Sequence, residues 1–181
     1  MRKLLWVLGL FLLVSAPAMA QDAPRVEIFG GYSYLRVDES GTGINLNGWN
    51  AAVAGNINQW FGVVGDFSGH YGSIDLAPTV KLDVNSHLFL AGPRFSCRKH
   101  ERVTLFAHVL LGGARDEFSA HGLSESNTAF AAAMGGGVDV KVSNRVAVRL
   151  FQADYVLTRF SDDSQHNFRL STGLVIRLGE R

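Results

Sequence analysis

The 181-residue sequence has little of three things: cysteine, long apolar runs and net charge. Cys97 is its one cysteine, so a disulfide within the chain is excluded, and we interpret the thiol as a tolerated surface group without a redox role. Lipid anchoring at a mature N-terminal cysteine is excluded as well. After residue 20 no stretch of 18 apolar residues occurs, so no transmembrane helix is predicted.

The first twenty residues have the three parts of a secretory signal peptide. Met1, Arg2 and Lys3 form a positive segment, 11 apolar residues follow from Leu4 to Val14, and an Ala-x-Ala motif ends at Ala20. The apolar segment is too short to anchor the chain, because a spanning helix needs about 20 apolar residues. The pattern predicts a signal peptide over residues 1–20, cleavage after Ala20 and one mature domain over residues 21–181.

Charge excludes one class of partner. Without Arg2 and Lys3 the mature chain has 15 basic and 16 acidic residues, a net charge of −1. A near-neutral chain without a basic stripe gives no support for nucleic-acid binding.

What the sequence does contain is a repeated two-residue alternation of polar and apolar side chains. It occurs in eight segments separated by turn-rich gaps: Arg25–Arg36, Leu46–Asn56, Trp60–Gly72, Val84–Ser96, Arg102–Arg115, Thr128–Val142, Arg145–Arg159 and Asn167–Leu178. These segments are longer than a typical soluble strand of about 5 to 6 residues. They suit tilted transmembrane strands of about 9 to 11 residues with some overhang.

The gaps between these segments alternate in length. The short ones are Ile57–Gln59, Cys97–Glu101 and Ser143–Asn144, and the long ones are Val37–Asn45, Ser73–Asp83, Asp116–Asn127 and Phe160–His166. Outer-membrane barrels have short periplasmic turns and long extracellular loops, so we expect four extracellular loops and both termini in the periplasm.

One face of each segment suits lipid and the other a small lumen. Leu105, Val109 and Leu111 alternate with Thr104, Phe106 and His108, for example. Lipid cannot satisfy backbone hydrogen bonds, so such a sheet must close. The predicted fold is all-β, an eight-stranded antiparallel up-and-down transmembrane β-barrel. Its interior would be just wide enough for its own side chains to fill.

Three segments need further interpretation. In residues 84–96, Arg94 places its even-numbered neighbours in the lumen. In residues 145–159, a β-bulge between Leu150 and Gln152 would turn Arg149, Gln152 and Asp154 inward together. Ala129–Ala133 alone favours a helix, but Gly135–Gly137 and the hairpin context favour a strand.

The inward face contains most of the polar candidates. They are Glu27, Asp66, His70, Arg94, His108, Asp139, Lys141, Arg149, Asp154, Arg169 and Arg177. Unpaired charges are costly in a narrow lumen, so we expect these groups to pair across it. They form either a structural network that plugs the barrel or a gate whose pairs exchange partners to admit small ions. A filled eight-stranded interior favours the plug.

Aromatic residues lie near the ends of the segments. Trp60, Phe61, Tyr71, Phe160 and Phe168 would form two girdles at the membrane interfaces. The alternative is a set of core aromatics in a soluble barrel.

Gly30–Tyr34, Leu110–Arg115 and Ser171–Leu178 resemble the OmpA/OmpX-like outer-membrane β-barrel family, over Arg25–Leu178. The resemblance implies an outer-membrane location among lipid and lipopolysaccharide. It also implies assembly by periplasmic chaperones and the barrel-assembly machinery. Ser171, Gly173, Ile176 and Leu178 are similar to the C-terminal β-signal of that family, although this chain continues to Gly179-Glu180-Arg181 where relatives often end in phenylalanine.

Enzyme and cofactor chemistry find little support. Some barrels of this size modify lipid A, and Ser164, His166 and the neighbouring Asp162 and Asp163 could form a nucleophile–base site. The order Ser-Gln-His-Asn differs from the His-x-Ser-Asn pattern of lipid A deacylases, so we predict no catalysis. The histidines lack metal-site spacing, and Gly135–Gly137 lacks the Lys-Ser/Thr of a phosphate loop, so no metal or cofactor is predicted.

The sequence thus favours a monomeric outer-membrane barrel of structural or surface-interaction type with a side-chain-filled lumen. The alternatives are a narrow low-conductance porin, a lipid A-modifying enzyme and a soluble lipocalin-like barrel. The last would have inverted faces, apolar inside and polar outside.

Overall fold

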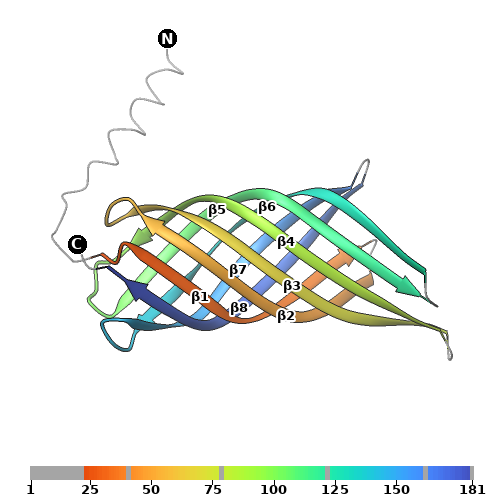
Figure 1. Ribbon diagram of the computed structural model, residues 1–181, viewed down its shortest axis with the longest axis horizontal. Helices are drawn as coiled ribbons and strands as arrows, with labels where there is room; N and C mark the ends of the chain where they lie inside the picture. Colours follow the sequence, from red (N-terminus) through yellow and green to blue (C-terminus); the bar gives the residue numbers. More distant parts are fainter. Residues whose placement is uncertain (1–22, 40–41, 78–79, 121–122, 161–162, 180–181) are drawn as a thin grey trace, which may run out of the picture.

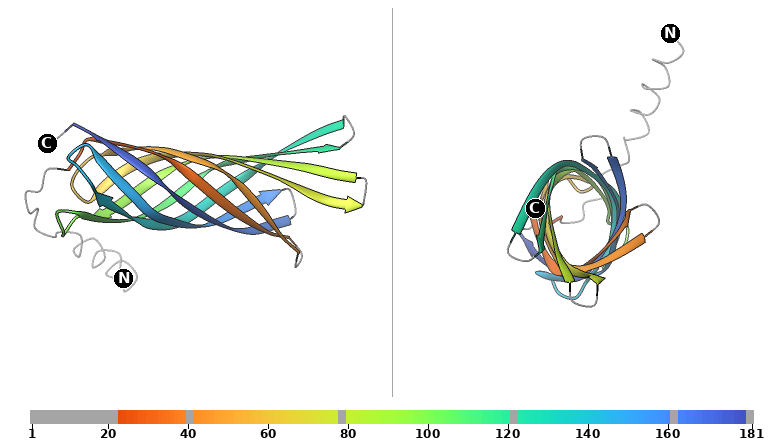
Figure 2. Two further views of the ribbon diagram at one scale, coloured as in Figure 1. Left: turned by 90° about the horizontal axis from the view of Figure 1, so that it is seen from below. Right: turned by 90° about the vertical axis from the view of Figure 1, so that its right-hand side faces the viewer.

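The computed structural model describes residues 23–39, 42–77, 80–120, 123–160 and 163–179, and it contains eight β-strands. They are β1 (Val26–Glu39), β2 (Thr42–Asn56), β3 (Phe61–Ala77), β4 (Val80–Cys97), β5 (Val103–Ala120), β6 (Leu123–Lys141), β7 (Val146–Phe160) and β8 (Asp163–Leu178). Each strand pairs antiparallel with its neighbour in the chain, and β8 pairs with β1. The predicted eight-stranded closed barrel is confirmed (Figures 1 and 2). Among the described residues, no helix is long and apolar enough to cross a membrane.

The two ends of the barrel differ. The first and last strands close the sheet with Val26 opposite Leu178, at the end where the turns 57–60, 98–102 and 142–145 lie (Figure 1). We call this the turn end and the opposite one the loop end. From the sequence we expect the turn end to lie in the periplasm. The signal peptide predicted over residues 1–20 lies outside the described residues.

The prediction of four long loops is wrong, because the strands continue through those segments. Antiparallel pairing extends to Glu39 opposite Thr42, to Ala77 opposite Val80, and to Ala120 opposite Leu123. The hairpins β3–β4 and β5–β6 project furthest at the loop end (Figure 2). Polar and glycine residues do not interrupt the pairing there. The outer face of a strand that extends beyond the membrane contacts water, so it can be polar.

The side chains sort by face as a membrane barrel requires. Leu105, Leu174 and Ile176 point outward and are 50%, 57% and 48% exposed. Asp66, Arg149 and Arg169 point inward and are at most 3% exposed. A soluble barrel would place these two groups the other way round.

The segments that needed interpretation are settled by the register. Val138 pairs with Phe151 and Asp139 with Arg149, so Leu150 is the extra residue of a β-bulge. Leu150 and Phe151 both face outward, and Arg149 and Gln152 are buried. The predicted bulge is confirmed. Arg94 and its even-numbered neighbours Ser86, Leu88 and Leu90 are buried as expected, and residues 129–133 lie in β6.

Candidate functional site

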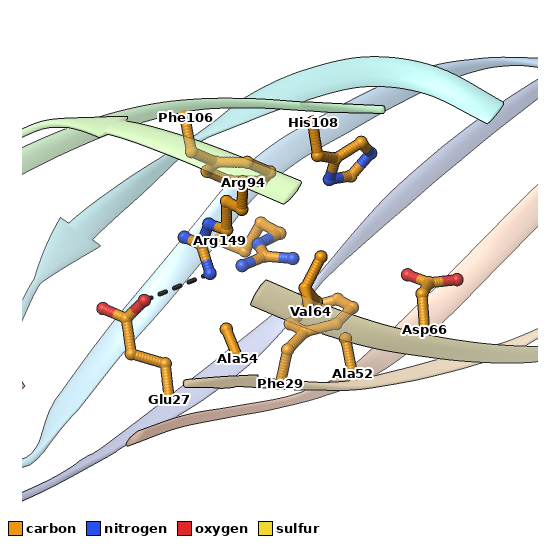
Figure 3. A pocket seen from close by; sticks show the side chains of 10 residues that line it. All are labelled: Glu27, Phe29, Ala52, Ala54, Val64, Asp66, Arg94, Phe106, His108 and Arg149. Carbon is orange, nitrogen blue, oxygen red and sulfur yellow. Dashed lines mark ion pairs between the residues drawn. The ribbon is translucent and has the colours of Figure 1, made fainter. Parts of the chain in front are cut away.

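The turn half of the lumen contains a cluster of ion pairs from four strands. Arg94 of β4 contacts Glu27 of β1 at 3.1 Å (Nη1–Oε2) and Asp139 of β6 at 3.3 Å (Nη2–Oδ2). Arg149 of β7 contacts the same Asp139 at 2.8 Å (Nε–Oδ1). We call Glu27, Arg94, Asp139 and Arg149 the turn-side cluster; Figure 3 shows the first pair with both arginines. Every member is buried, so each charge depends on its partner.

Two phenylalanines complete this cluster. The Arg149 guanidinium lies 4.1 Å from the ring centroid of Phe29 and 4.3 Å from that of Phe106, and Arg94 lies 4.2 Å from Phe106 (Figure 3). A desolvated cation over a ring face is stabilised by the ring quadrupole. The sequence placed Phe106 on the inward face but did not predict that aromatic rings would stack against lumen arginines.

A second cluster occupies the middle of the lumen. Arg169 of β8 contacts Asp66 of β3 and Asp154 of β7, both at 2.7 Å, and its Nη1 donates to Ser68 Oγ at 3.0 Å. His108 Nε2 of β5 lies 2.8 Å from Asp154 Oδ1. We call Asp66, His108, Asp154 and Arg169 the central cluster. Arg169 is fully buried, and both carboxylates contact its guanidinium.

Gln152 joins the two clusters. Arg149 Nη1 donates to Gln152 Oε1 at 2.5 Å, and Gln152 Nε2 donates to Asp154 Oδ2 at 2.7 Å. Asn50 of β2 donates to Asp66 Oδ1 at 3.0 Å. With Asn50 the connected network has members on all eight strands. It therefore crosslinks all eight strands of the closed barrel through its interior.

The other predicted lumen residues lie at the edges of this network. Arg177 contacts Glu27 at 3.7 Å and is partly exposed at the turn end. His70 lies 2.9 Å from Ser33, whose hydroxyl is 3.0 Å from that of Ser171, so it forms a separate group on the loop side. Lys141 is only half-buried near the end of β6 and takes no part in the clusters.

Arg98 is a member of the lumen network that the sequence interpretation missed. It lies in the turn after β4, yet its guanidinium contacts Glu27 at 3.4 Å and donates to the Gln59 carbonyl. Alternation cannot reveal it, because turn residues have no period. The only available signal was its spacing, four residues after the lumen residue Arg94.

The loop half of the lumen is filled differently. Leu35, Leu46 and Val84 are buried together with Val37 and Ile44 packed on them, and we call these five the loop-side apolar cluster. A cavity of about 40 Å³ lies beside them, with Thr158 and Asn167 on its other wall. A second cavity of about 10 Å³ separates the turn-side and central clusters (Figure 3).

The predicted aromatic residues lie at both ends of the outer face. Trp60 stacks on Phe95 at 6.1 Å between ring centroids, and Phe61 packs against both. Tyr71 and Phe168 are exposed towards the loop end, where Tyr71 meets the His87 ring edge-on. The Phe160 side chain lies outside the described residues.

An apolar outer face, a polar interior and a closed antiparallel sheet define an integral membrane β-barrel. Residues 6–175 match the family model of the outer membrane protein beta-barrel domain. The chain belongs to this family and is an outer-membrane protein of the OmpA-like type. A search of curated proteins finds no match.

Solved structures share the fold. Ail, the attachment invasion locus protein of Yersinia pestis, solved with the heparin analogue sucrose octasulfate, is 25% identical with a TM-score of 0.61, covering 84% of this chain and 99% of that one. Neisserial surface protein A is 13% identical with a TM-score of 0.66, covering 88% and 100%. OprG of Pseudomonas aeruginosa is 8% identical with a TM-score of 0.51, covering 88% and 98%.

Proposed function

We propose that this protein is a closed barrel of structural and surface-interaction type, which acts through its exposed hairpins and does not conduct. The observation that supports this is the network linking side chains of all eight strands across the lumen. The cavity between its two clusters measures about 10 Å³, about the space that one water needs. A hydrated ion would have to separate several buried ion pairs to pass.

Planar-bilayer recording of the refolded protein tests this proposal against a narrow porin. We expect no current steps. Arg94→Ser provides a matched variant, because Glu27 keeps Arg98 and Arg177 and Asp139 keeps Arg149. It should remain silent, since the central cluster still closes the lumen. Steps from the wild type that grow in Arg94→Ser would contradict the closed barrel and favour the low-conductance pore.

The hairpins at the loop end suggest the chemistry of a partner. The four sequence segments 36–45, 73–83, 115–128 and 159–166 contain nine acidic and four basic residues. Ail was crystallised with a polysulfate, but a polyanion would meet a net charge of −5 here. We therefore propose a cationic partner surface. Binding of the protein in nanodiscs to immobilised polylysine, but not to heparin, is the expected result, and the reverse preference would contradict it.

We further propose that the protein is not an enzyme. His166 lies on the outer face, hydrogen-bonded through Nδ1 to the Tyr155 hydroxyl, and the Ser164 side chain lies outside the described residues. Incubation with lipopolysaccharide followed by mass spectrometry of lipid A should show no change. Loss of an acyl chain that depends on His166 would establish the lipid-modifying alternative.

We propose that Ser171, Gly173, Ile176 and Leu178 act as the β-signal, and their positions in β8, the strand that closes the barrel, support this. Ser171 faces the lumen and Ile176 and Leu178 face lipid, while a Cβ on Gly173 would lie 2.3 Å from the Gly30 carbonyl oxygen across the β1–β8 seam. We propose that periplasmic chaperones deliver the chain to the barrel-assembly machinery, which recognises β8. We also propose that the signal peptide is cleaved after Ala20 before the barrel assembles. Gly173→Val should leave the chain unfolded and protease-sensitive in cells, whereas Gly30→Val, with nothing within 4 Å, should assemble.

A further inference from the structure

The charges of the protein are sorted along the barrel axis. Among the described residues, the turn end has seven basic side chains and two acidic ones, Glu27 and Glu101; the basic ones are Arg25, Arg98, Lys99, Arg102, Lys141, Arg145 and Arg177. The network between the ends balances three arginines against three aspartates. The loop end has the acidic excess described above. The barrel is therefore strongly dipolar, with its positive end at the turns.

The basic residues lie on neighbouring strand ends around the turn-end rim. The Lys141 amide donates to the Arg102 carbonyl at 2.7 Å, and the Arg177 amide donates to the Arg145 carbonyl at 2.8 Å. Arg98 and Arg177 both contact Glu27, which they share with Arg94. No ion pair of the described residues includes Lys99, Arg102 or Arg145, and all three are exposed. Their charges are available to an external anion.

An aromatic cluster fixes the depth of this rim in the membrane. Trp60, Phe61 and Phe95 pack together on the outer face. The Ser96 amide donates to the Trp60 carbonyl at 2.8 Å and Arg98 donates to the Gln59 carbonyl, which tie the turn 98–102 to the aromatic rings. Exposed tryptophans of membrane proteins lie at the lipid headgroup level. Lys99 and Arg102 lie in the turn that directly follows β4, the strand that bears Phe95, and so they reach the phosphate layer.

We propose that the turn-end rim binds anionic phospholipid headgroups of the periplasmic leaflet, through Lys99, Arg102 and Arg145. The ligand class follows from two features: unpaired cations attract phosphodiester anions, and their position beside lipid-facing aromatic rings puts them in the headgroup layer that surrounds the barrel. Phosphatidylglycerol, with a net negative charge, is preferred over zwitterionic lipid. The proposal is independent of the partner suggested for the opposite end.

Lipid retention tests this directly. The protein is refolded into nanodiscs of equal phosphatidylcholine and phosphatidylglycerol and released into mild detergent, and the retained lipids are counted by native mass spectrometry. The wild type should retain phosphatidylglycerol in excess. Lys99→Gln/Arg102→Gln/Arg145→Gln should lower the ratio of the two lipids by up to about fivefold for each cation removed at low salt. Raising the salt concentration should weaken the preference of the wild type.

The loop end supplies the matched control. Arg36→Gln/Arg115→Gln/Arg159→Gln removes the same charge from three outward-facing residues at the other end, and it should keep the wild-type ratio. Arg102→Lys/Arg145→Lys should also keep it, because charge rather than hydrogen-bond geometry selects the lipid. Cold-versus-boiled gel migration checks that each variant is folded. An unchanged ratio in the turn-end variant, an equal loss in the control, or rim-dependent binding to peptidoglycan sacculi with no lipid preference would overturn the proposal.

Discussion

The two halves of the lumen differ in the charged groups that they contain. Between the turn end and the middle, a network that includes three arginines and three aspartates links all eight strands beside buried apolar side chains such as Ala54 and Val64, whereas Leu35, Leu46 and Val84 pack together in the loop half. Among the described residues, the buried ion pairs therefore lie in the turn half and the middle of the lumen, and the ion pair at the loop end is an exposed one on the outer face.

The outer face explains the difference. Around the middle of the barrel the outside is apolar, with Val109 and Leu174 exposed to lipid. At the loop end it is polar, with Arg36 and Asn45 exposed. A strand that leaves the membrane becomes an ordinary half-buried strand and needs an apolar inner face to stay folded. Within the membrane lipid covers the outer face, and directional polar bonds can hold the interior.

Breaking the central cluster should have the largest effect. Arg169→Met leaves Asp66 and Asp154 buried without their cation, and should destabilise the barrel by about 3 to 5 kcal/mol. Urea unfolding in lipid vesicles, followed by tryptophan fluorescence and gel shift, measures it. Asp66→Asn/Asp154→Asn/Arg169→Met removes the orphaned charges and should recover most of the loss. A single variant as stable as the wild type would show that the cluster is not energetically coupled.

The loop-side apolar cluster should respond less. Leu35→Ala removes a buried side chain next to a cavity of about 40 Å³. We expect a loss of about 2 kcal/mol, the low end of the range for leucine deletion, because the nearby space lets the site relax. The same unfolding measurement applies. Leu111→Ala on the lipid face is the control and should cost less, and an equal cost in both would remove the distinction between the faces.

Breaking the contact between the turn 98–102 and the lumen should reduce the stability by less still. Arg98→Gln removes its contacts to Glu27 and to the Gln59 carbonyl. Arg94 and Arg177 remain with Glu27, and water reaches the turn, so we expect a loss of about 1 kcal/mol. Hydrogen exchange of the turn amides should rise with little change in the middle of the barrel. A loss as large as that of Arg169→Met would place Arg98 within the main network.

The difference between the membrane-spanning part and the loop end also determines how much of the fold could be predicted from the sequence. Two-residue alternation located all eight strands, and the mismatch of Arg149 with Gln152 located the bulge at Leu150, because lipid outside and ions inside give a strong signal. From Leu35 to Val37 the polarity of the two faces is reversed: the inward side chains are apolar and the charged Arg36 faces outward. A pattern with polar residues on the inward face throughout ends at this point, so the sequence predicts loops where the structure has paired hairpins.

The pairing partners within the lumen could not be predicted in the same way. Alternation indicates that Asp66 and Arg169 share the interior, but their meeting depends on the stagger of strands 103 residues apart in the chain. The link through Gln152 depends on the bulge. It turns Arg149, three residues before Gln152, to the same inward face as Gln152 and Asp154, two residues after it. Such contacts follow from closure, which is a property of the whole sheet.

An ion pair on the outer face at the loop end should contribute least. Arg115 contacts Glu117 at 3.2 Å, with 56% and 39% of their side chains exposed. The pair has nearly the chemistry of Arg169 with Asp66, but water and salt screen it and the flexible side chains lose entropy on pairing. We expect Arg115→Gln to change stability by less than about 0.5 kcal/mol, and by less again at high salt. A loss above about 2 kcal/mol would mean that burial is not what separates the strong pairs from the weak ones.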